Sequence, residues 1–355
     1  MKSFRVLGFL TAGLMLGLLP ACGPTGDTGK PKVAFVSNNP ESFWTIAEAG
    51  ASKSAGESNV ELLFKRPDKG DPGVQRTVID GAVDQGAKAI AVSVIDPKNQ
   101  ADYIDKVADK IPFICVDNDA PSTKRLCYIG TDNYEGGKAA GRLVKEALPD
   151  GGKVAIFVGD LAPLNARQRR QGVIDELAGG KDVEVKDGAE YGKYTLFRTY
   201  TDQPEGAQKA KANAIAALES KDLKDEPNVC LVGLWAYNPP ALLSAVTDKK
   251  KLGKVKIVAF DENSETLQGI ADGYITGTVV QNPYQFGFQS VKLMAELAKG
   301  DKSHVPADGM MPIDFRILTK DGGKEYPETV HGEKKSIPVK DFREELDTLL
   351  GKKKS

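Results

Sequence analysis

The chain has 355 residues, sufficient for two domains of ordinary size, and carries 48 Lys and Arg against 49 Asp and Glu. This balance lacks the clustered basic surplus of nucleic-acid-binding domains, so we expect no nucleic-acid partner. Four cysteines and two histidines, without a Cys-x-x-Cys pair, support neither a disulfide framework nor a metal site, and we expect no cofactor.

The first residues have the pattern of an export signal. Lys2 and Arg5 precede an uncharged, almost entirely apolar run over 6–19. A positive start followed by a short apolar run is typical of a secretory signal peptide, and this run is too short to span a membrane comfortably. A transmembrane anchor, or an ordinary signal followed by a chance cysteine, is the alternative.

The end of this segment carries a second signal. Leu19-Pro20-Ala21-Cys22 resembles a bacterial lipobox, and the resemblance implies cleavage before Cys22 and lipidation of its thiol. We therefore predict a lipoprotein signal peptide over 1–21 and a lipidated tether over 22–31. The working protein is then exported and anchored by lipid to a membrane, at its periplasmic or cell-surface face.

Short apolar segments alternate with helix-like segments along the rest of the chain. The expected strands include 33–36, 89–94, 113–116, 154–158, 229–232 and 256–260. The expected helices include 44–57, 99–110, 135–148, 165–178, 204–220 and 240–247. Continuous apolar strands between amphipathic helices indicate an α/β fold with parallel sheets covered on both faces.

The two halves of the chain repeat one pattern. A late apolar strand in the first half ends at Asp117, and a late strand in the second half ends at Asp261. Ligands of open α/β sheets bind at the carboxyl ends of the strands, so two lobes with such edges would enclose a cleft. The alternative is that both aspartates are helix N-caps.

The polar residues at these strand ends belong to five short motifs. They are Asn38-Asn39-Pro40-Glu41-Ser42-Phe43-Trp44, Asp117-Asn118, Asn165-Ala166-Arg167-Gln168-Arg169-Arg170-Gln171-Gly172, Ala259-Phe260-Asp261 and Val280-Gln281-Asn282-Pro283. In this order they resemble the bacterial periplasmic sugar-binding proteins of the ribose and galactose type, over roughly residues 32–319.

This resemblance implies the type I periplasmic binding protein fold, in which two doubly wound parallel-sheet lobes are joined by a three-strand hinge. The N-terminal lobe would comprise 32–130 plus 282–314, and the C-terminal lobe 131–281 plus 315–340. The remaining residues, 341–355, are expected to form a polar tail.

The resemblance also implies a ligand site between the lobes. Carboxylates and amides hold paired hydroxyls, arginine supplies forked donors, and aromatic rings cover apolar sugar faces. The expected ligand-binding residues are Asn39, Glu41, Phe43, Trp44, Asp117, Asn118, Arg167, Tyr237, Asn238, Asp261 and Gln281.

Several of these choices have alternatives. Asn39 and Glu41 compete for one polar position of the family, and Phe43 and Trp44 at a helix start could instead be core residues. Arg167 is chosen over its arginine neighbours because it matches the family's position, and the alternative is a solvated charge.

We predict a binding protein and not an enzyme. The expected function is that of a monomeric, lipid-anchored substrate-binding protein of an ABC importer, with a ribose-, xylose- or galactose-like monosaccharide and a membrane permease as partners. Asn118 stands where ribose binders usually carry arginine, which leaves the sugar open. Alternative ligands are a nucleoside, a cyclitol or a furanose signal molecule.

A sugar-responsive regulator core and a hydrolase are further alternatives. The export leader argues against the regulator, and the missing nucleophile elbow and usable histidine argue against the hydrolase.

Cys115 and Cys127 lie in strand-like runs separated by a short polar loop. Neighbouring strands could bring them together as a disulfide, and two buried free thiols are the alternative.

Overall fold

The computed structural model describes residues 1, 29–326, 331–332 and 335–351. The predicted signal peptide over 1–21 and the lipidation site Cys22 lie outside these residues, so both stay predictions. Met1–Lys30 is a unit separate from Pro31–Ser355, and the strands and helices below all belong to the second unit. None of the helices that the structure describes is both long and apolar enough to cross a membrane.

The first sheet is made of parallel strands in the order β12-β5-β4-β3-β1-β2. Its strands are β1 (Lys32–Val36), β2 (Glu61–Lys65), β3 (Ala89–Val92), β4 (Phe113–Val116), β5 (Tyr128–Gly130) and β12 (Met310–Pro312). Its helices are α1 (Phe43–Ser58), α2 (Pro72–Asp84), α3 (Ala101–Ala108) and α9 (Pro283–Leu297).

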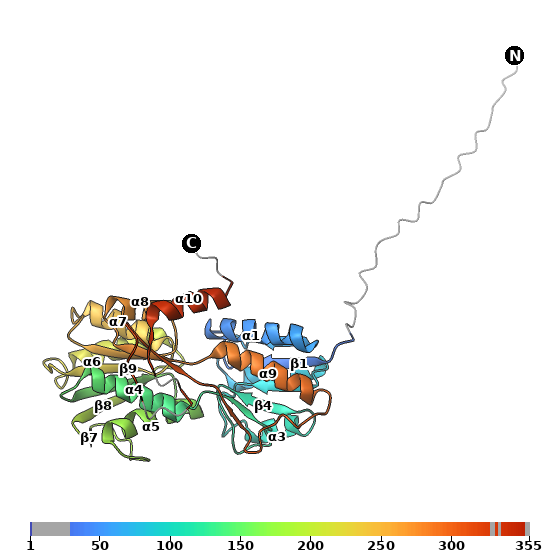
Figure 1. Ribbon diagram of the computed structural model, residues 1–355, viewed down its shortest axis with the longest axis horizontal. Coiled ribbons are helices and arrows are strands. Elements are labelled where there is room, and N and C mark those ends of the chain that lie inside the picture. The colour runs from blue at the N-terminus through green and yellow to red at the C-terminus, as the bar shows by residue number, and fades with distance from the viewer. Residues whose placement is uncertain (2–28, 327–330, 333–334, 352–355) are drawn as a thin grey trace. The chain divides into compact units, whose positions relative to one another are not determined.

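Both faces of this sheet are covered by helices. Successive strand side chains point to opposite faces, so Phe35 packs under α1 and α9 while Val36 packs under α2 and α3. Figure 1 shows α1 and α9 side by side over one face.

The second sheet has the order β14-β13-β11-β10-β9-β6-β8-β7, with a parallel centre from β11 to β8. Its strands are β6 (Gly152–Val158), β7 (Glu190–Tyr191), β8 (Tyr194–Thr201), β9 (Val229–Gly233), β10 (Lys256–Phe260), β11 (Gly277–Val280), β13 (Arg316–Thr319) and β14 (Ile337–Pro338). Helices α4 (Asn133–Ala147) and α5 (Leu164–Ala178) cover one face. Helices α6 (Ala207–Glu219), α7 (Asn238–Asp248) and α8 (Ser264–Asp272) cover the other.

Within the described residues, the chain passes between the two sheets three times. The passages follow β5, β11 and β12 in chain order. Each sheet with its helices is one lobe, and the passages join the lobes. The predicted fold class, α/β with two doubly wound parallel-sheet lobes, is confirmed.

The end of the chain differs from the polar tail that we predicted from residue 341. Residues Val339–Leu349 form helix α10, and Val339 and Phe342 are each only 3% exposed. Val339, Phe342 and Leu346 recur at helical spacing and pack on the second lobe. Because charged residues separate these apolar positions, the overall composition of the segment is polar, and the apolar helix face was not predicted.

The structure also decides between the two alternatives for the cysteines. Cys115, Cys127 and Cys230 are free and buried in the described part of the chain. Cys115 lies beside Tyr128 in the register of β4 and β5, so Cys127, one residue earlier, points to the opposite face of the sheet. A bridge between these thiols would have to cross the sheet.

Helices α1 and α9 approach closely because both carry glycine at their contact. A Cβ atom on Gly287 would lie 1.9 Å from the carbonyl oxygen of Ala47, and one on Gly50 would lie 2.0 Å from that of Tyr284. These neighbours are backbone atoms, so a larger residue at either position must push the helices apart.

We expect Gly287→Ala to lower the free energy of unfolding by about 1–3 kcal/mol, because overpacking displaces backbone. Gly56→Ala, in the partner helix α1, is the matched control, since a Cβ atom there meets nothing within 4 Å. The control should stabilise the protein by roughly 0.5–1 kcal/mol through helix propensity. Urea unfolding measures both effects, and equal losses in the two variants would contradict the prediction.

Candidate functional site

Two aspartates occupy equivalent places at the carboxyl ends of β4 and β10. Asp117 has a φ of 62° and Asp261 a φ of 67°, in the left-handed region that few residues with a side chain adopt. Each is only 5% exposed. Neither is a helix N-cap, since Asp132 caps α4, the next helix after Asp117, and Asn263 caps α8, the next helix after Asp261. The N-cap alternative is therefore wrong, and backbone strain of this kind concentrates at functional sites.

A single arginine from α5 joins these carboxylates. Arg169 is 2% exposed, and its Nη1 lies 3.7 Å from Oδ2 of Asp261. Its Nε donates to Oδ1 of Asn133 at 2.8 Å, and Nη1 donates to the carbonyl oxygen of Leu234 at 3.0 Å. The guanidinium carbon lies 4.0 Å from the ring centroid of Phe260. These contacts together hold the Arg169 guanidinium in one orientation.

The electrostatics of the cluster favour hydrogen-bond donors. Burial raises the pKa of Asp117 to about 6, although Arg169 and a 2.9 Å hydrogen bond from Ser93 lower it. Burial also raises the pKa of Asp261, against the opposing effects of Arg169 and Gln281. Each aspartate is close enough for Arg169 to lower its pKa, so two carboxylates share one guanidinium. A ligand that offers donors would compensate the remaining acceptors.

Amides extend the cluster. Gln281 donates from Nε2 to Oδ1 of Asp261 at 2.8 Å, while its own Oε1 is buried with no partner among the described residues. Asn118 donates to the carbonyl oxygen of Val94 and accepts from the backbone N of Asn165 at 3.2 Å, so it bonds the two lobes together. Buried acceptors without a donor need an explanation, and a bound donor supplies one.

The arginine in this cluster is not the one that we predicted. Arg167 is exposed, and its Nη1 donates to the carbonyl oxygens of Leu161 and Ala162. Two positions along a helix turn a side chain by about 200°, to nearly the opposite face. The structure therefore places Arg169 in the cluster and Arg167 outside it.

The two aromatic residues that begin α1, Phe43 and Trp44, differ in their surroundings. Trp44 is 1% exposed and packs edge-on against Phe35 in the core of the first lobe, which matches the core alternative. Phe43 is half-buried. Asn39 accepts from Nε1 of Trp44 at 3.1 Å and from the backbone N of Glu41 at 3.0 Å, so it organises this turn. Glu41 itself is exposed.

The loop after β9 bonds to a further acidic residue, Asp202, which directly follows β8 and which the sequence analysis missed. Asp202 is 0% exposed and accepts from the Tyr237 hydroxyl and from Nδ2 of Asn238. Oδ1 of Asn238 accepts from the backbone N of Trp235 at 2.9 Å, so this amide is used inside the lobe. Asp202 follows β8, whose sequence Tyr194–Thr201 includes Arg198 and three threonines, so it lacks the uninterrupted apolar run that precedes Asp117 and Asp261.

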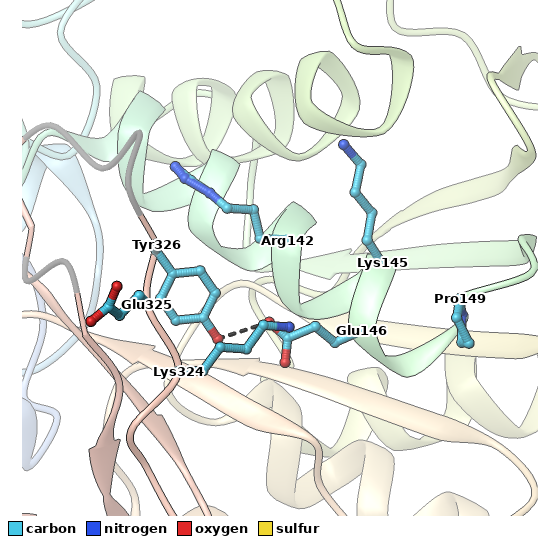
Figure 2. Close-up of a pocket in the computed structure, with 7 residues that line it drawn as sticks. All are labelled: Arg142, Lys145, Glu146, Pro149, Lys324, Glu325 and Tyr326. Carbon is cyan, nitrogen blue, oxygen red and sulfur yellow. Dashed lines mark hydrogen bonds and ion pairs between the residues drawn. The ribbon is translucent and has the colours of Figure 1, made fainter.

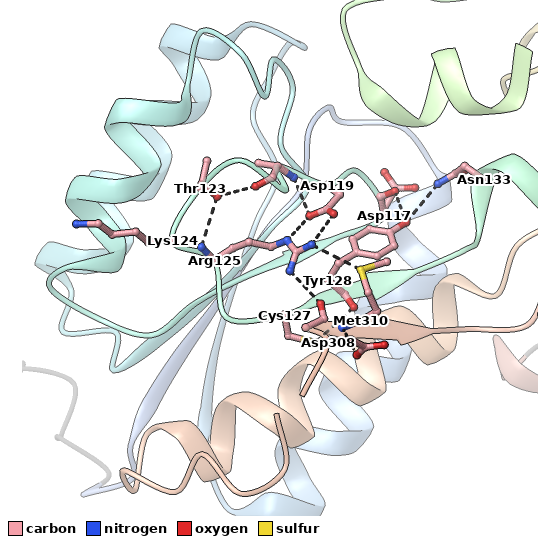
Figure 3. A network of polar contacts seen from close by, with 12 residues as sticks. Asp117, Asp119, Thr123, Lys124, Arg125, Cys127, Tyr128, Asn133, Asp308 and Met310 are labelled. Carbon is pink, nitrogen blue, oxygen red and sulfur yellow. Dashed lines mark hydrogen bonds and ion pairs between the residues drawn. The ribbon is translucent and has the colours of Figure 1, made fainter. Parts of the chain in front are cut away.

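Hydrogen bonds link Asp117 through Tyr128 to Asn133 at the passage after β5 (Figure 3). The Tyr128 hydroxyl donates to the carbonyl oxygen of Asp117 at 3.0 Å and accepts from Nδ2 of Asn133 at 3.2 Å. Asn133 in turn accepts from Arg169. Alongside, Arg125 makes a bidentate pair with Asp119 that braces the loop between β4 and β5. The orientation of the cluster therefore depends on this passage.

A separate hollow lies between α4 and the chain before residue 327 (Figure 2). It is lined by Arg142, Lys145, Glu146, Pro149, Lys324, Glu325 and Tyr326. Glu146 pairs with Lys324 at 2.7 Å and accepts from the Tyr326 hydroxyl at 2.8 Å. None of the cluster residues lines it, so we do not place the functional site there. Across the described ranges, no group of three or more His, Cys, Asp or Glu could hold a metal ion.

Comparison with known proteins identifies relatives along most of the chain. Residues 33–302 match the family model described as periplasmic binding protein domain. The ribose import binding protein RbsB of Haemophilus influenzae is 23% identical over 322 residues, which are 89% of this chain and 100% of the relative. The D-allose-binding periplasmic protein of Escherichia coli is 24% identical over 310 residues, covering 84% and 93%.

Solved structures share the fold. GanP, a glucose-galactose binding protein from Geobacillus stearothermophilus, superimposes with a TM-score of 0.73 at 24% identity, covering 82% of this chain and 97% of that one. A solute-binding protein from Burkholderia graminis in complex with D-arabinose also has a TM-score of 0.73 at 24% identity, covering 82% and 96%. At these identities the likeness shows the two-lobed fold alone.

Proposed function

Because the chain belongs to the periplasmic binding protein family, we propose that it is a substrate-binding protein that takes a monosaccharide between its two lobes. The observation that carries this proposal is the buried cluster of two aspartates and one arginine at the strand ends of both sheets. The names of relatives support a sugar: ribose, fructose and D-allose are their stated ligands.

The chemistry of the cluster fits a neutral polyhydroxyl compound. The carboxylates of Asp117 and Asp261 and the free carbonyl of Gln281 can accept from hydroxyls. Arg169 supplies donors to sugar oxygens and compensates carboxylate charge. In the ligand set we therefore replace Arg167 with Arg169 and keep Asp117, Asn118, Asp261 and Gln281. Phe43, Glu41 and the aromatic pair Trp235 and Tyr237 are the proposed outer contacts.

The proposed role in transport rests on the predicted signal peptide over 1–21 and on Cys22. We propose that cleavage before Cys22 and lipidation of its thiol anchor the protein outside the cytoplasm, where it acts as a monomer. There the liganded form would be recognised by an ABC permease, since closure of two lobes creates a shape that a partner can distinguish. This is a binding function, and we expect no chemical change of the sugar.

A thermal-shift panel of pentoses, hexoses, cyclitols and nucleosides tests the proposal. A sugar at 100 times its Kd should add about 2.7 kcal/mol to the stability of the native state and raise Tm accordingly. The hit is then measured by calorimetry and recovered unchanged after incubation, which separates binding from hydrolysis. A Tm unaffected by every pentose and hexose would count against the proposal, and a shift by a nucleoside or cyclitol alone would redirect it.

A further inference from the structure

Among the described residues, Asp202 is a buried carboxylate that accepts from Tyr237 and Asn238 and forms no ion pair. Burial raises its pKa to about 7, although the hydrogen bonds from Tyr237 and Asn238 lower it. A buried charge is costly unless it is paired. A carboxylate kept in such a place is more often functional than one on the surface.

The carboxylate holds one end of the loop between β9 and α7. Asn238 connects it to the backbone of Trp235, and Arg169 holds the carbonyl of Leu234 at the loop's start. The backbone N of Asp202 also donates to the carbonyl oxygen of Gly159 at 3.1 Å.

Gly159 packs against the indole ring of Trp235 in the loop between β9 and α7. A Cβ atom there would lie 2.0 Å from the ring of Trp235, so the indole rests directly on the glycine. The ring of Tyr237 stands nearly perpendicular to that indole, at 89° and 6.1 Å between centroids. We call these two rings the aromatic corner. Its geometry depends on Asp202, which accepts hydrogen bonds from Tyr237 and from Asn238.

The corner lies within electrostatic range of the first lobe. Burial and then Asp202 raise the pKa of Tyr237, and the Glu41 carboxylate, which lies before α1, adds a smaller increase. The Tyr237 hydroxyl donates to Asp202 and accepts from Nε2 of Gln203 at 3.0 Å. Because the hydroxyl is used on both sides, the ring is what Tyr237 offers to a ligand, and aromatic rings cover the C–H faces of sugars.

We propose that Asp202 is a positioning residue that fixes the aromatic corner of Trp235 and Tyr237, and thereby helps the protein to distinguish sugar epimers. The proposal deepens the proposed function and rests on it for the identity of the ligand. It assigns Asp202 no contact with the sugar.

The position of the corner is tested without a ligand. The chain has two tryptophans, so Trp44→Phe leaves Trp235 as the single emitter. In that background Asp202→Asn should raise the acrylamide quenching constant of Trp235 by roughly twofold, because the loop opens locally. Asp175→Asn is the matched control, since Asp175 is 1% exposed and accepts from the Tyr134 hydroxyl at 2.8 Å. It should leave the quenching unchanged.

Selectivity is tested by calorimetry with D-ribose and its epimers D-arabinose and D-xylose, and with D-galactose and its epimer D-glucose. Asp202→Asn should reduce the Kd ratio between the best sugar and its weakest-binding epimer by roughly threefold or more, whereas Asp175→Asn should retain it. Tyr237→Phe keeps the ring and removes one donor, so it should give a smaller change and serves if Asp202→Asn does not fold. Unchanged quenching and selectivity in a folded Asp202→Asn or Tyr237→Phe protein would overturn the inference. If the wild type binds none of the sugars, the proposed function fails, while the quenching experiment still decides the role of Asp202.

Discussion

Arg169→Leu should weaken sugar binding by about 2–4 kcal/mol and destabilise the protein by about 3–5 kcal/mol at pH 8. The guanidinium lies 3.7 Å from Asp261 and lowers the pKa of both Asp261 and Asp117. Without it, two buried carboxylates are left with hydrogen bonds alone. Calorimetry with the sugar from the panel measures the affinity, and urea unfolding measures the stability.

The loss of stability should depend on pH. Both aspartates already have a raised pKa in the folded protein, so their ionisation costs stability as pH rises through that folded pKa. Removing Arg169 raises these pKa values further and increases the cost at pH 8, whereas at pH 4 the Asp117 carboxyl, whose pKa is about 6, is largely protonated in either protein. The difference between variant and wild type should therefore shrink from pH 8 to pH 4.

Arg167→Leu, two positions earlier in α5, is the matched control. Its side chain is exposed and bonded only to two carbonyls of the preceding loop. We expect a change of stability within about 1 kcal/mol and no loss of affinity. If the losses were instead as large for Arg167→Leu as for Arg169→Leu, the assignment of the arginine would be reversed.

Trp44→Ala should destabilise the protein by about 3–5 kcal/mol, the usual cost of removing a large aromatic side chain from a core. Trp44 is 1% exposed, and its ring lies 5.9 Å from Phe35 and 5.1 Å from Phe43. The Trp44→Ala variant also loses the hydrogen bond that Nε1 of Trp44 donates to Asn39. Denaturant unfolding measures the effect, and we expect the midpoint to fall while the m value stays unchanged.

Its neighbour should behave in the opposite way. Phe43 is half-buried at the start of α1, so Phe43→Ala should act mainly on sugar affinity, by roughly 1–3 kcal/mol through lost apolar contact. Tyr274→Ala, at an exposed side chain, is the control and should change neither quantity appreciably. A Trp44→Ala protein of wild-type stability but weak sugar binding would return Trp44 to the ligand site.

Local pattern was sufficient for the buried strands. Residues such as Phe35 and Val158 stand in uninterrupted apolar runs, because a central parallel strand is covered on both faces. The pattern failed at the margins. Strand β2, at the edge of the first sheet, is partly exposed throughout and carries Glu61 and Lys65, so its sequence does not stand out. Helix α10 was missed for the related reason that only one narrow face is apolar.

The positions of the buried cluster residues were predictable where they follow strand ends. Asp117, Asp261 and Gln281 follow apolar strands, and the doubly wound topology brings such ends to one edge of each sheet. Asp202 also follows a strand, but Arg198 and three threonines interrupt the apolar pattern of β8, so the same rule did not single it out. The choice between Arg167 and Arg169 could not be made in this way, because it depends on the rotation of α5 about its own axis.

The sequence by itself determined the class of the protein: the alternation of apolar strands with helices, the polar strand ends, and the family motifs in order. These are properties of short segments, which local side-chain chemistry sets. The tertiary structure decided which face each side chain presents. Cys115 and Cys127 point to opposite sides of a sheet, Trp44 points into a core, and Arg169 points into the cluster. A face depends on register and helix rotation, and both are set by packing between segments far apart in the chain.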